Sequence, residues 1–287
     1  MAVKPTRRTI SLSGLDHTLY AWEQGSDTTL LFLHGFLDVG EGFSFIVESL
    51  KDTGWNCLAL DWRGHGRSSW IGEGGYYHFI DYVRDLEECV QKLNRSNLYV
   101  VGHSMGAMAL TLWLGATKRI VKGAVLLESL GPIPVSSEAA EARIGQWLSD
   151  VEMIRAPRHY PDLATVVKKL QRLYTNVPVH RIKQIAQWAV MEEEEGMRWR
   201  YDPLHRTRSP IPVPENLAIK LWQSIRVPLL WIGGEESPWR GERLEWWLSL
   251  RPDLRRQRLP NAGHMLQYEE PEQTGYCIRS FIEKLGK

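Results

Sequence analysis

The stretch Gly102-His103-Ser104-Met105-Gly106 decides the fold of this 287-residue chain. It lies between a short apolar run, residues 98–101, and a segment of helical periodicity, residues 105–116. A turn this tight between a strand and a helix strains the backbone of its central residue and leaves room only for small residues two positions either side. Gly102 and Gly106 occupy those two positions. The start of the helix also places free N–H groups beside Ser104. The pattern predicts an exposed nucleophilic serine at the end of a buried strand.

Strand-like and helical segments alternate along most of the chain. Residues 8–12 and 17–23 favour an antiparallel pair, and apolar runs predict further strands at residues 30–33, 56–60, 98–101, 122–127, 228–232 and 255–259. Helical patterns are found at residues 42–51, 78–93, 105–116, 241–250 and 271–285. Strands separated by helices form right-handed crossovers and a mostly parallel sheet that is covered on both faces. The sequence therefore predicts a doubly wound α/β fold.

This alternation stops between residues 132 and 225, where helical periodicity dominates at residues 138–155, 161–174, 179–191 and 215–225. We expect an inserted helical cap of residues 132–225 on a core of residues 1–131 and 226–287. Such an insertion lies over the carboxyl ends of the strands, where ligands bind in open α/β sheets. Its residues Trp147, Trp188 and Trp222 are candidates for lining a ligand site, beside the simpler role of holding the cap together. The acidic run 192–195 is interpreted as a solvated helix end.

The composition favours a packed protein that acts on a small molecule. Hydrophobic residues make up 43% and charged residues 24% of the chain. The net charge of +1 provides no field that would attract nucleic acid or an anionic membrane. The N-terminal residues lack the apolar stretch of a signal peptide, and no apolar run reaches the roughly 18 residues that span a bilayer, so we expect a cytoplasmic protein. The composition does not indicate an oligomeric state.

The cysteine pattern predicts neither disulfides nor a metal. The three cysteines, Cys57, Cys89 and Cys277, are widely spaced and lack a neighbouring histidine or cysteine at ligand spacing. We interpret them as reduced core residues, and we expect no metal or cofactor.

A serine hydroxyl needs a general base, and the oxyanion that its attack creates needs two preorganised donors. His264 is the candidate base, since Asn261-Ala262-Gly263-His264 follows the last predicted strand and precedes the final helix. No other histidine of the nine combines this position with the expected chain order of serine, acid and histidine. The backbone N–H groups of Phe36 and Met105 are the candidate oxyanion donors, Phe36 because the strand at residues 30–33 ends in His-Gly.

These pieces together resemble the α/β-hydrolase-fold superfamily over essentially all of the chain. The matching segments are His34-Gly35-Phe36, residues 61–68, residues 102–106 and Gly263-His264. Residues 77–82, 128–132 and 202–210 are similar to the serine hydrolase-like branch of that superfamily. The resemblance implies a hydrolase in which a serine, a histidine and an acid form a triad.

The acid is where the chain departs from the commonest pattern. Many relatives carry an aspartate in a Gly-x-x-Asp-Pro turn after the strand that follows the cap, but here Ser237 stands at that position. Some relatives instead use a carboxylate after the strand that precedes the cap, which corresponds to Glu128. A carboxylate at the end of so apolar a strand is costly to bury unpaired, and a histidine partner removes that cost. The sequence favours Glu128, with Glu235 or Glu236, or a dyad without a strong acid, as alternatives.

The resulting hypothesis is a serine hydrolase that cleaves a carboxylic ester, a thioester or a lactone of a small apolar substrate through an acyl-enzyme on Ser104. The serine disfavours dehalogenase and epoxide hydrolase chemistry, for which an aspartate nucleophile is usual. Two alternatives are a hydrolase of carbon–carbon bonds and a non-catalytic protein that binds a small ligand in the same pocket.

Overall fold

The computed structural model describes residues 4–131, 137–154, 156–207 and 209–286. Its centre is an eight-stranded sheet with the order β1-β2-β4-β3-β5-β6-β10-β11. The strands are β1 (Thr6–Leu12), β2 (Leu15–Trp22), β3 (Thr28–Leu33), β4 (Asn56–Leu60), β5 (Asn97–His103), β6 (Gly123–Leu127), β10 (Leu229–Gly234) and β11 (Arg255–Leu259). All neighbours from β4 to β11 pair in parallel, whereas β2 pairs antiparallel with both β1 and β4. The predicted doubly wound α/β fold is confirmed.

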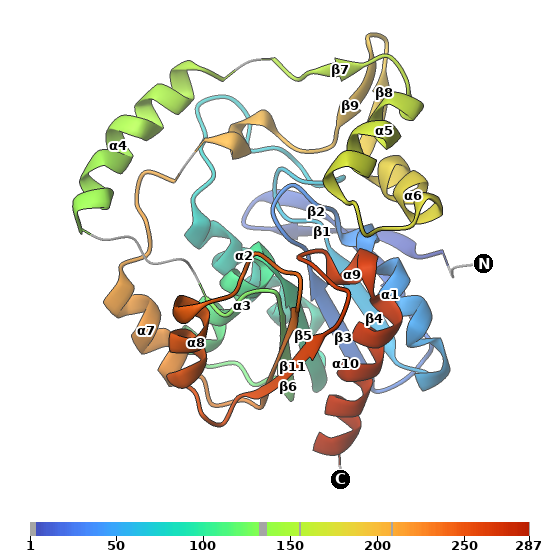
Figure 1. Ribbon diagram of the computed structural model, residues 1–287, viewed down its shortest axis with the longest axis vertical. Helices are drawn as coiled ribbons and strands as arrows, with labels where there is room; N and C mark the ends of the chain where they lie inside the picture. Colours follow the sequence, from blue (N-terminus) through green and yellow to red (C-terminus); the bar gives the residue numbers. More distant parts are fainter. Residues whose placement is uncertain (1–3, 132–136, 155, 208, 287) are drawn as a thin grey trace.

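Helices cover both faces of this sheet (Figure 1). The buried side chains of α2 (Phe79–Leu93), α3 (Met105–Ala116), α7 (Glu215–Ser224) and α8 (Glu242–Ser249) join one apolar core. Those of α1 (Ser44–Ser49), α9 (Leu266–Glu269) and α10 (Pro271–Leu285) join a second core on the opposite face. The central strands β4 and β6 are buried along their whole length, which explains why they are continuous apolar runs.

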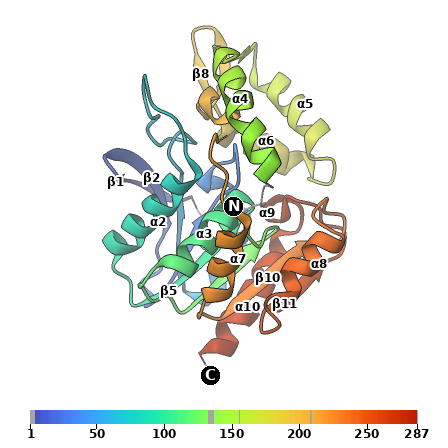
Figure 2. The same ribbon diagram turned by 90° about the vertical axis from the view of Figure 1, so that its left-hand side faces the viewer.

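The segment between β6 and α7 lies at one end of the molecule, above the sheet (Figure 2). It contains α4 (Ser137–Glu152), β7 (His159–Tyr160), α5 (Leu163–Leu173), α6 (Val179–Ala189), β8 (Val190–Glu193) and β9 (Gly196–Trp199). It also contains a 3₁₀ turn, Pro203–Arg206. A third apolar cluster from α5, α6 and β8 holds this part together and contacts Tyr268 of α9.

Two features of this segment differ from the sequence expectation. The acidic run 192–195 is not a helix end, because β8 and β9 form a hairpin that joins β7 in a three-stranded sheet. Gly196 supplies the positive φ of 119° at the hairpin. Helix α7, which we assigned to the cap, packs on α3 instead. A Cβ at Gly115 of α3 would lie 2.3 Å from the carbonyl oxygen of Leu221, so the missing side chain permits this close approach.

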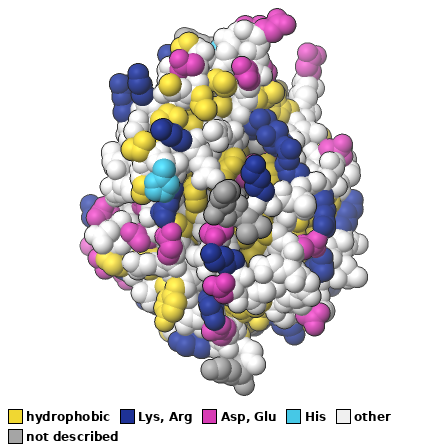
Figure 3. Space-filling view, turned by 90° about the vertical axis from the view of Figure 1, so that its right-hand side faces the viewer, with side chains coloured by type: hydrophobic (Ala, Val, Ile, Leu, Met, Phe, Trp, Pro, Cys, Tyr) yellow, Lys and Arg dark blue, Asp and Glu magenta, His cyan; other side chains and the backbone are white. Residues whose placement is uncertain are grey.

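No described helix is long and apolar enough to cross a membrane. Positively and negatively charged side chains both occur over the face seen in Figure 3, in keeping with the net charge of +1.

Candidate active site

Ser104 lies between the end of β5 and the start of α3, with φ 49° and ψ −114°. This left-handed conformation costs a non-glycine residue about 1–3 kcal/mol. A Cβ at Gly102 would lie 2.7 Å from the backbone of Ala107, and one at Gly106 would lie 2.2 Å from the carbonyl oxygen of Leu33. Both glycines are therefore required by the close packing of the turn against its neighbours.

The structure brings Ser104, His264 and Glu128 together from the carboxyl ends of three strands. The Oγ of Ser104 lies 3.0 Å from Nε2 of His264, and Nδ1 of His264 lies 3.1 Å from Oε2 of Glu128. A hydroxyl bonded to an imidazole whose other nitrogen faces a carboxylate can lose its proton to that imidazole. The histidine is partly exposed, whereas the carboxylate is 1% exposed. The serine end of this arrangement is therefore accessible to solvent, whereas the acid end is buried.

Glu128 is surrounded by donors as well as by the histidine. It follows β6 with a φ of 61°, its Oε1 accepts a hydrogen bond of 2.6 Å from the N–H of Gly234, and its Oε2 accepts one from the hydroxyl of Ser237. These donors compensate for the burial of the charge. The exposed Glu235 does not contact His264, and the exposed Glu236 accepts a hydrogen bond from Asn176 instead.

The loop after β3 packs directly on the serine turn. A Cβ at Gly35 would lie 2.8 Å from Nδ1 of His103 and 3.2 Å from Cβ of Ser104. Within the described chain, the N–H groups of Phe36 and Met105 donate no hydrogen bond to another residue. His34 braces this loop, because its Nε2 accepts from the backbone N–H of Trp62 at 3.0 Å.

A buried polar chain lies behind His264. Nε2 of His103 donates to the carbonyl oxygen of His264 at 2.8 Å. Gln267 bridges Nδ1 of His103 and the carboxylate of Asp38, which also accepts a hydrogen bond of 2.5 Å from Tyr268. Burial lowers the pKa of His103 to about 3, so this ring stays neutral, and burial raises the pKa of Asp38 to about 6. No sequence pattern indicates the link from His103 through Gln267 to Asp38.

Three buried histidines join the loop after β3 to the segment above the sheet. His205, from the 3₁₀ turn, stacks on Tyr77 with ring centroids 3.7 Å apart. It also packs against His65 in a tilted arrangement with centroids 3.9 Å apart, and His65 contacts His34. The hydroxyl of Tyr77 donates to Asp202 at 2.8 Å. Burial holds the pKa of His205 well below its ordinary value and lowers that of His65 to about 4, so both rings are neutral and pack as aromatic groups.

A cavity of about 750 Å³ lies beside Ser104 and is lined by both the core and the overlying segment. Its walls are largely aromatic and apolar, with Phe36, Tyr77, Tyr82, Met108 and Ile211 among them. Arg143 and Arg206 supply positive charge at this cavity. The volume suits a compact organic ligand.

The three candidate tryptophans do not line this cavity. Trp222 of α7 is fully buried against α8, where its indole N–H donates to the carbonyl oxygen of Trp247. Trp188 packs against Phe45 with ring centroids 5.3 Å apart, and Trp147 packs against Tyr76 at 5.1 Å. Each holds elements together, the simpler of the two roles considered from the sequence. Helical periodicity could not show that much of the wall instead comes from residues 77–82, 205–207 and 209–213.

Potential metal ligands gather away from this cavity. In the described parts of the chain, one group, His159, Glu193 and Glu195, brings three ligand atoms within 4.8 Å of one another. Arg198 already donates to both carboxylate oxygens of Glu193, at 2.6 and 2.7 Å. The guanidinium thus already binds the central carboxylate of this group.

The fold and this geometry agree with the comparison to known families. Residues 28–271 match the family model described as the alpha/beta hydrolase fold. The chain therefore belongs to the α/β-hydrolase-fold family.

Particular relatives resemble the chain over most of its length. The 2-(acetamidomethylene)succinate hydrolase of Mesorhizobium japonicum is 28% identical over 93% of this chain and 92% of its own. A serine hydrolase-like protein of Dictyostelium discoideum is 27% identical over 78% of this chain and 65% of its own. Among solved structures, the thioesterase domain from the curacin biosynthetic pathway superposes with a TM-score of 0.87 at 24% identity, over 96% of this chain and 100% of that domain.

Proposed function

We propose that this protein is a serine hydrolase that cleaves a carboxylic ester, thioester or lactone through an acyl-enzyme on Ser104. The observation that carries the proposal is the continuous contact from Ser104 through His264 to Glu128, with distances of 3.0 and 3.1 Å. Each of these side chains has the chemistry that its position requires: a nucleophile, a general base and a buried acid.

The reaction proceeds in two balanced halves. The Ser104 oxygen attacks the substrate carbonyl while Nε2 of His264 takes its proton, and Glu128 stabilises the imidazolium that forms. The N–H groups of Phe36 and Met105 bind the oxyanion. As the carbon–oxygen or carbon–sulfur bond breaks, His264 gives the proton to the leaving group. Water then repeats the steps on the acyl-enzyme and releases the acid and the free serine.

The cavity supports a compact substrate with an apolar acyl group. Aromatic and aliphatic side chains line most of its 750 Å³. Burial of such an acyl group contributes roughly 0.8 kcal/mol per CH₂ unit. We propose that residues 137–154 and 156–207 act as a lid that limits the length of the bound acyl chain.

Hydrolysis of a p-nitrophenyl ester series, from acetate to laurate, tests the proposal with wild type and Ser104→Ala side by side. Lactones and an aryl thioester extend the series. We expect hydrolysis by wild type, a preference for one chain length and loss of at least 10³-fold in the variant. Equal rates for the two folded proteins overturn the acyl-enzyme mechanism. Absence of hydrolysis by both, with cleavage of a vinylogous diketone, supports a carbon–carbon bond hydrolase instead.

A further inference from the structure

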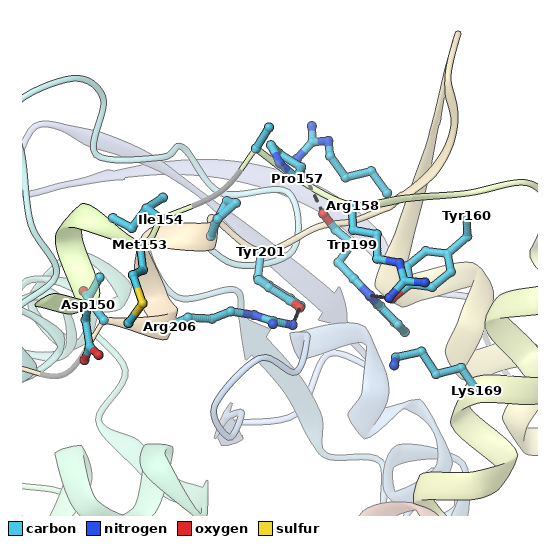
Figure 4. A pocket seen from close by; sticks show the side chains of 14 residues that line it. Asp150, Met153, Ile154, Pro157, Arg158, Tyr160, Lys169, Trp199, Tyr201 and Arg206 are labelled. Atoms are coloured by element: carbon cyan, nitrogen blue, oxygen red, sulfur yellow. Dashed lines mark hydrogen bonds between the residues drawn. The ribbon is translucent and has the colours of Figure 1, made fainter.

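A second cavity of about 590 Å³ lies entirely within the segment above the sheet. Its walls come from the end of α4, from β7 and β9, from α5 and from the 3₁₀ turn (Figure 4). It meets the catalytic cavity at Arg206 and Thr207, which line both. The two cavities therefore adjoin each other at these two residues.

The second cavity is rich in positive charge. Of its cationic side chains, Arg158, Lys169 and Arg206 have no carboxylate partner among the residues that the structure describes, whereas Arg198 is paired with Glu193. Asp150 is the one carboxylate among the described lining residues, and it accepts a hydrogen bond from Gln146. Three unpaired cations around one concave site favour an anion with several charges, and arginine binds phosphate oxygens well.

Flat aromatic groups lie between these cations. Tyr201 and Trp199 are nearly parallel, with an angle of 14° and ring centroids 6.3 Å apart. Arg206 donates to the hydroxyl of Tyr201, whereas Arg158, Tyr160 and Lys169 gather at the other side of the cavity (Figure 4). Aromatic faces stack on nucleobases of any sequence. The site thus combines partners for phosphate with partners for a planar base.

We propose that this cavity binds the phosphorylated adenosine end of a coenzyme A thioester while the acyl group reaches Ser104. The proposal rests on the proposed hydrolase function and names its substrate class. The pantetheine arm passes Arg206 and Thr207, the residues common to both cavities. In the reaction the bond from the carbonyl carbon to sulfur breaks, His264 protonates the thiolate, and free coenzyme A leaves before water releases the acid.

The test compares two thioesters of one acyl group, hexanoyl-coenzyme A and hexanoyl-N-acetylcysteamine, which differ only beyond the cysteamine unit. We expect wild type to show a kcat/KM at least tenfold higher for the coenzyme A ester. In Lys169→Glu this ratio falls about tenfold, the loss expected for one charge-assisted phosphate contact. The matched control is Lys168→Glu, an exposed neighbour on α5 that does not line the cavity and keeps the wild-type ratio.

A binding measurement separates this inference from the proposed function. Adenosine 3′,5′-bisphosphate is titrated calorimetrically into wild type, Lys169→Glu and Lys168→Glu, with inorganic phosphate as competitor. Binding that only Lys169→Glu weakens supports the cavity assignment, even if neither thioester is hydrolysed and the hydrolase proposal fails. Hydrolysis of both thioesters at equal kcat/KM without bisphosphate binding overturns the inference and leaves the hydrolase intact. The inference is also overturned if inorganic phosphate displaces the bisphosphate at the same concentration as the bisphosphate itself, because the cavity would then be a simple anion site that does not recognise the nucleotide.

Discussion

The hydroxyl of Ser237 donates a hydrogen bond to the carboxylate of Glu128, across the carboxyl ends of β6 and β10. Ser237 occupies the position at which the family resemblance implies an aspartate, and it is 1% exposed. An aspartate there would place a second negative charge against Glu128 in a buried site, which is costly. A serine at this position instead donates a hydrogen bond to the glutamate at the end of the neighbouring strand.

Glu128→Gln should lower kcat by about 10³-fold or more, because a neutral amide cannot stabilise the imidazolium on His264. Glu235→Gln and Glu236→Gln are the matched controls. Their carboxylates are exposed and do not contact the histidine, so their kcat should stay within twofold of wild type. Steady-state kinetics on the preferred p-nitrophenyl ester measure all three. Equal losses in Glu128→Gln and Glu235→Gln would move the acid assignment to the loop after β10.

Ser237→Ala should lower activity by roughly tenfold, since it removes one donor of about 1.5–3 kcal/mol from the charged Glu128. In the double variant Glu128→Gln, Ser237→Asp, the acid moves to the other strand end. We expect this protein to regain part of the kcat that Glu128→Gln alone loses. A double variant no more active than the single one would show that an acid at position 237 cannot orient His264.

Ser104→Gly should unfold at a higher temperature than Ser104→Ala. Glycine adopts a φ of 49° without strain, whereas alanine keeps the strain of the native serine. A difference of about 1 kcal/mol corresponds to roughly 2–4 °C in a chain of this size. Differential scanning calorimetry measures it with both inactive proteins at one pH. A Ser104→Ala protein that is the more stable of the two would argue against stored strain at the turn.

Asp38 should make stability fall as the pH rises from about 4 to about 6. Burial raises the pKa of this carboxyl to about 6, so in that range the folded protein holds a proton that the unfolded chain has released. The free energy of unfolding should fall by roughly 1–2 kcal/mol over this range. The change is no larger because water screens part of the side chain. Asp38→Asn should remove this contribution, and the exposed Asp52→Asn should not. Urea unfolding at pH 4.5, 5.5 and 7 gives the free energies of unfolding. The expectation would be contradicted if the free energy of unfolding changed with pH by the same amount in wild type and Asp38→Asn.

Much of the fold could be predicted because its signals are local. The strands β3 to β6 are short apolar runs, and the turn at residues 102–106 needs its glycines for steric reasons visible in the sequence. The small sheet of β7, β8 and β9 was missed, since its strands are two to four residues long and mostly half-exposed. Residues 179–191 show helical spacing up to Met191, and only Val190 hints at the change to a strand.

Part of the candidate site could likewise be predicted from the sequence, and part could not. Ser104 and His264 stand in local motifs, and Glu128 was favoured because it follows the apolar strand before the cap, where some relatives carry the acid, so their proximity could be anticipated from the sequence. The contacts of Ser237 with Glu128 and of His205 with His65 join residues 109 and 140 positions apart. The first contact depends on the pairing of β6 with β10 and the second on how the segment above the sheet folds back, and no local pattern encodes either.

Labelling with a fluorophosphonate tests the central claim most directly, because an activated serine displaces fluoride from the reagent and becomes phosphonylated. Intact mass and peptide mapping should show one adduct, on Ser104, in wild type. His264→Ala should form it at least 10²-fold more slowly, and Ser104→Ala should form none. A folded wild-type protein that stays unlabelled, or that carries the adduct on another serine, would contradict the account.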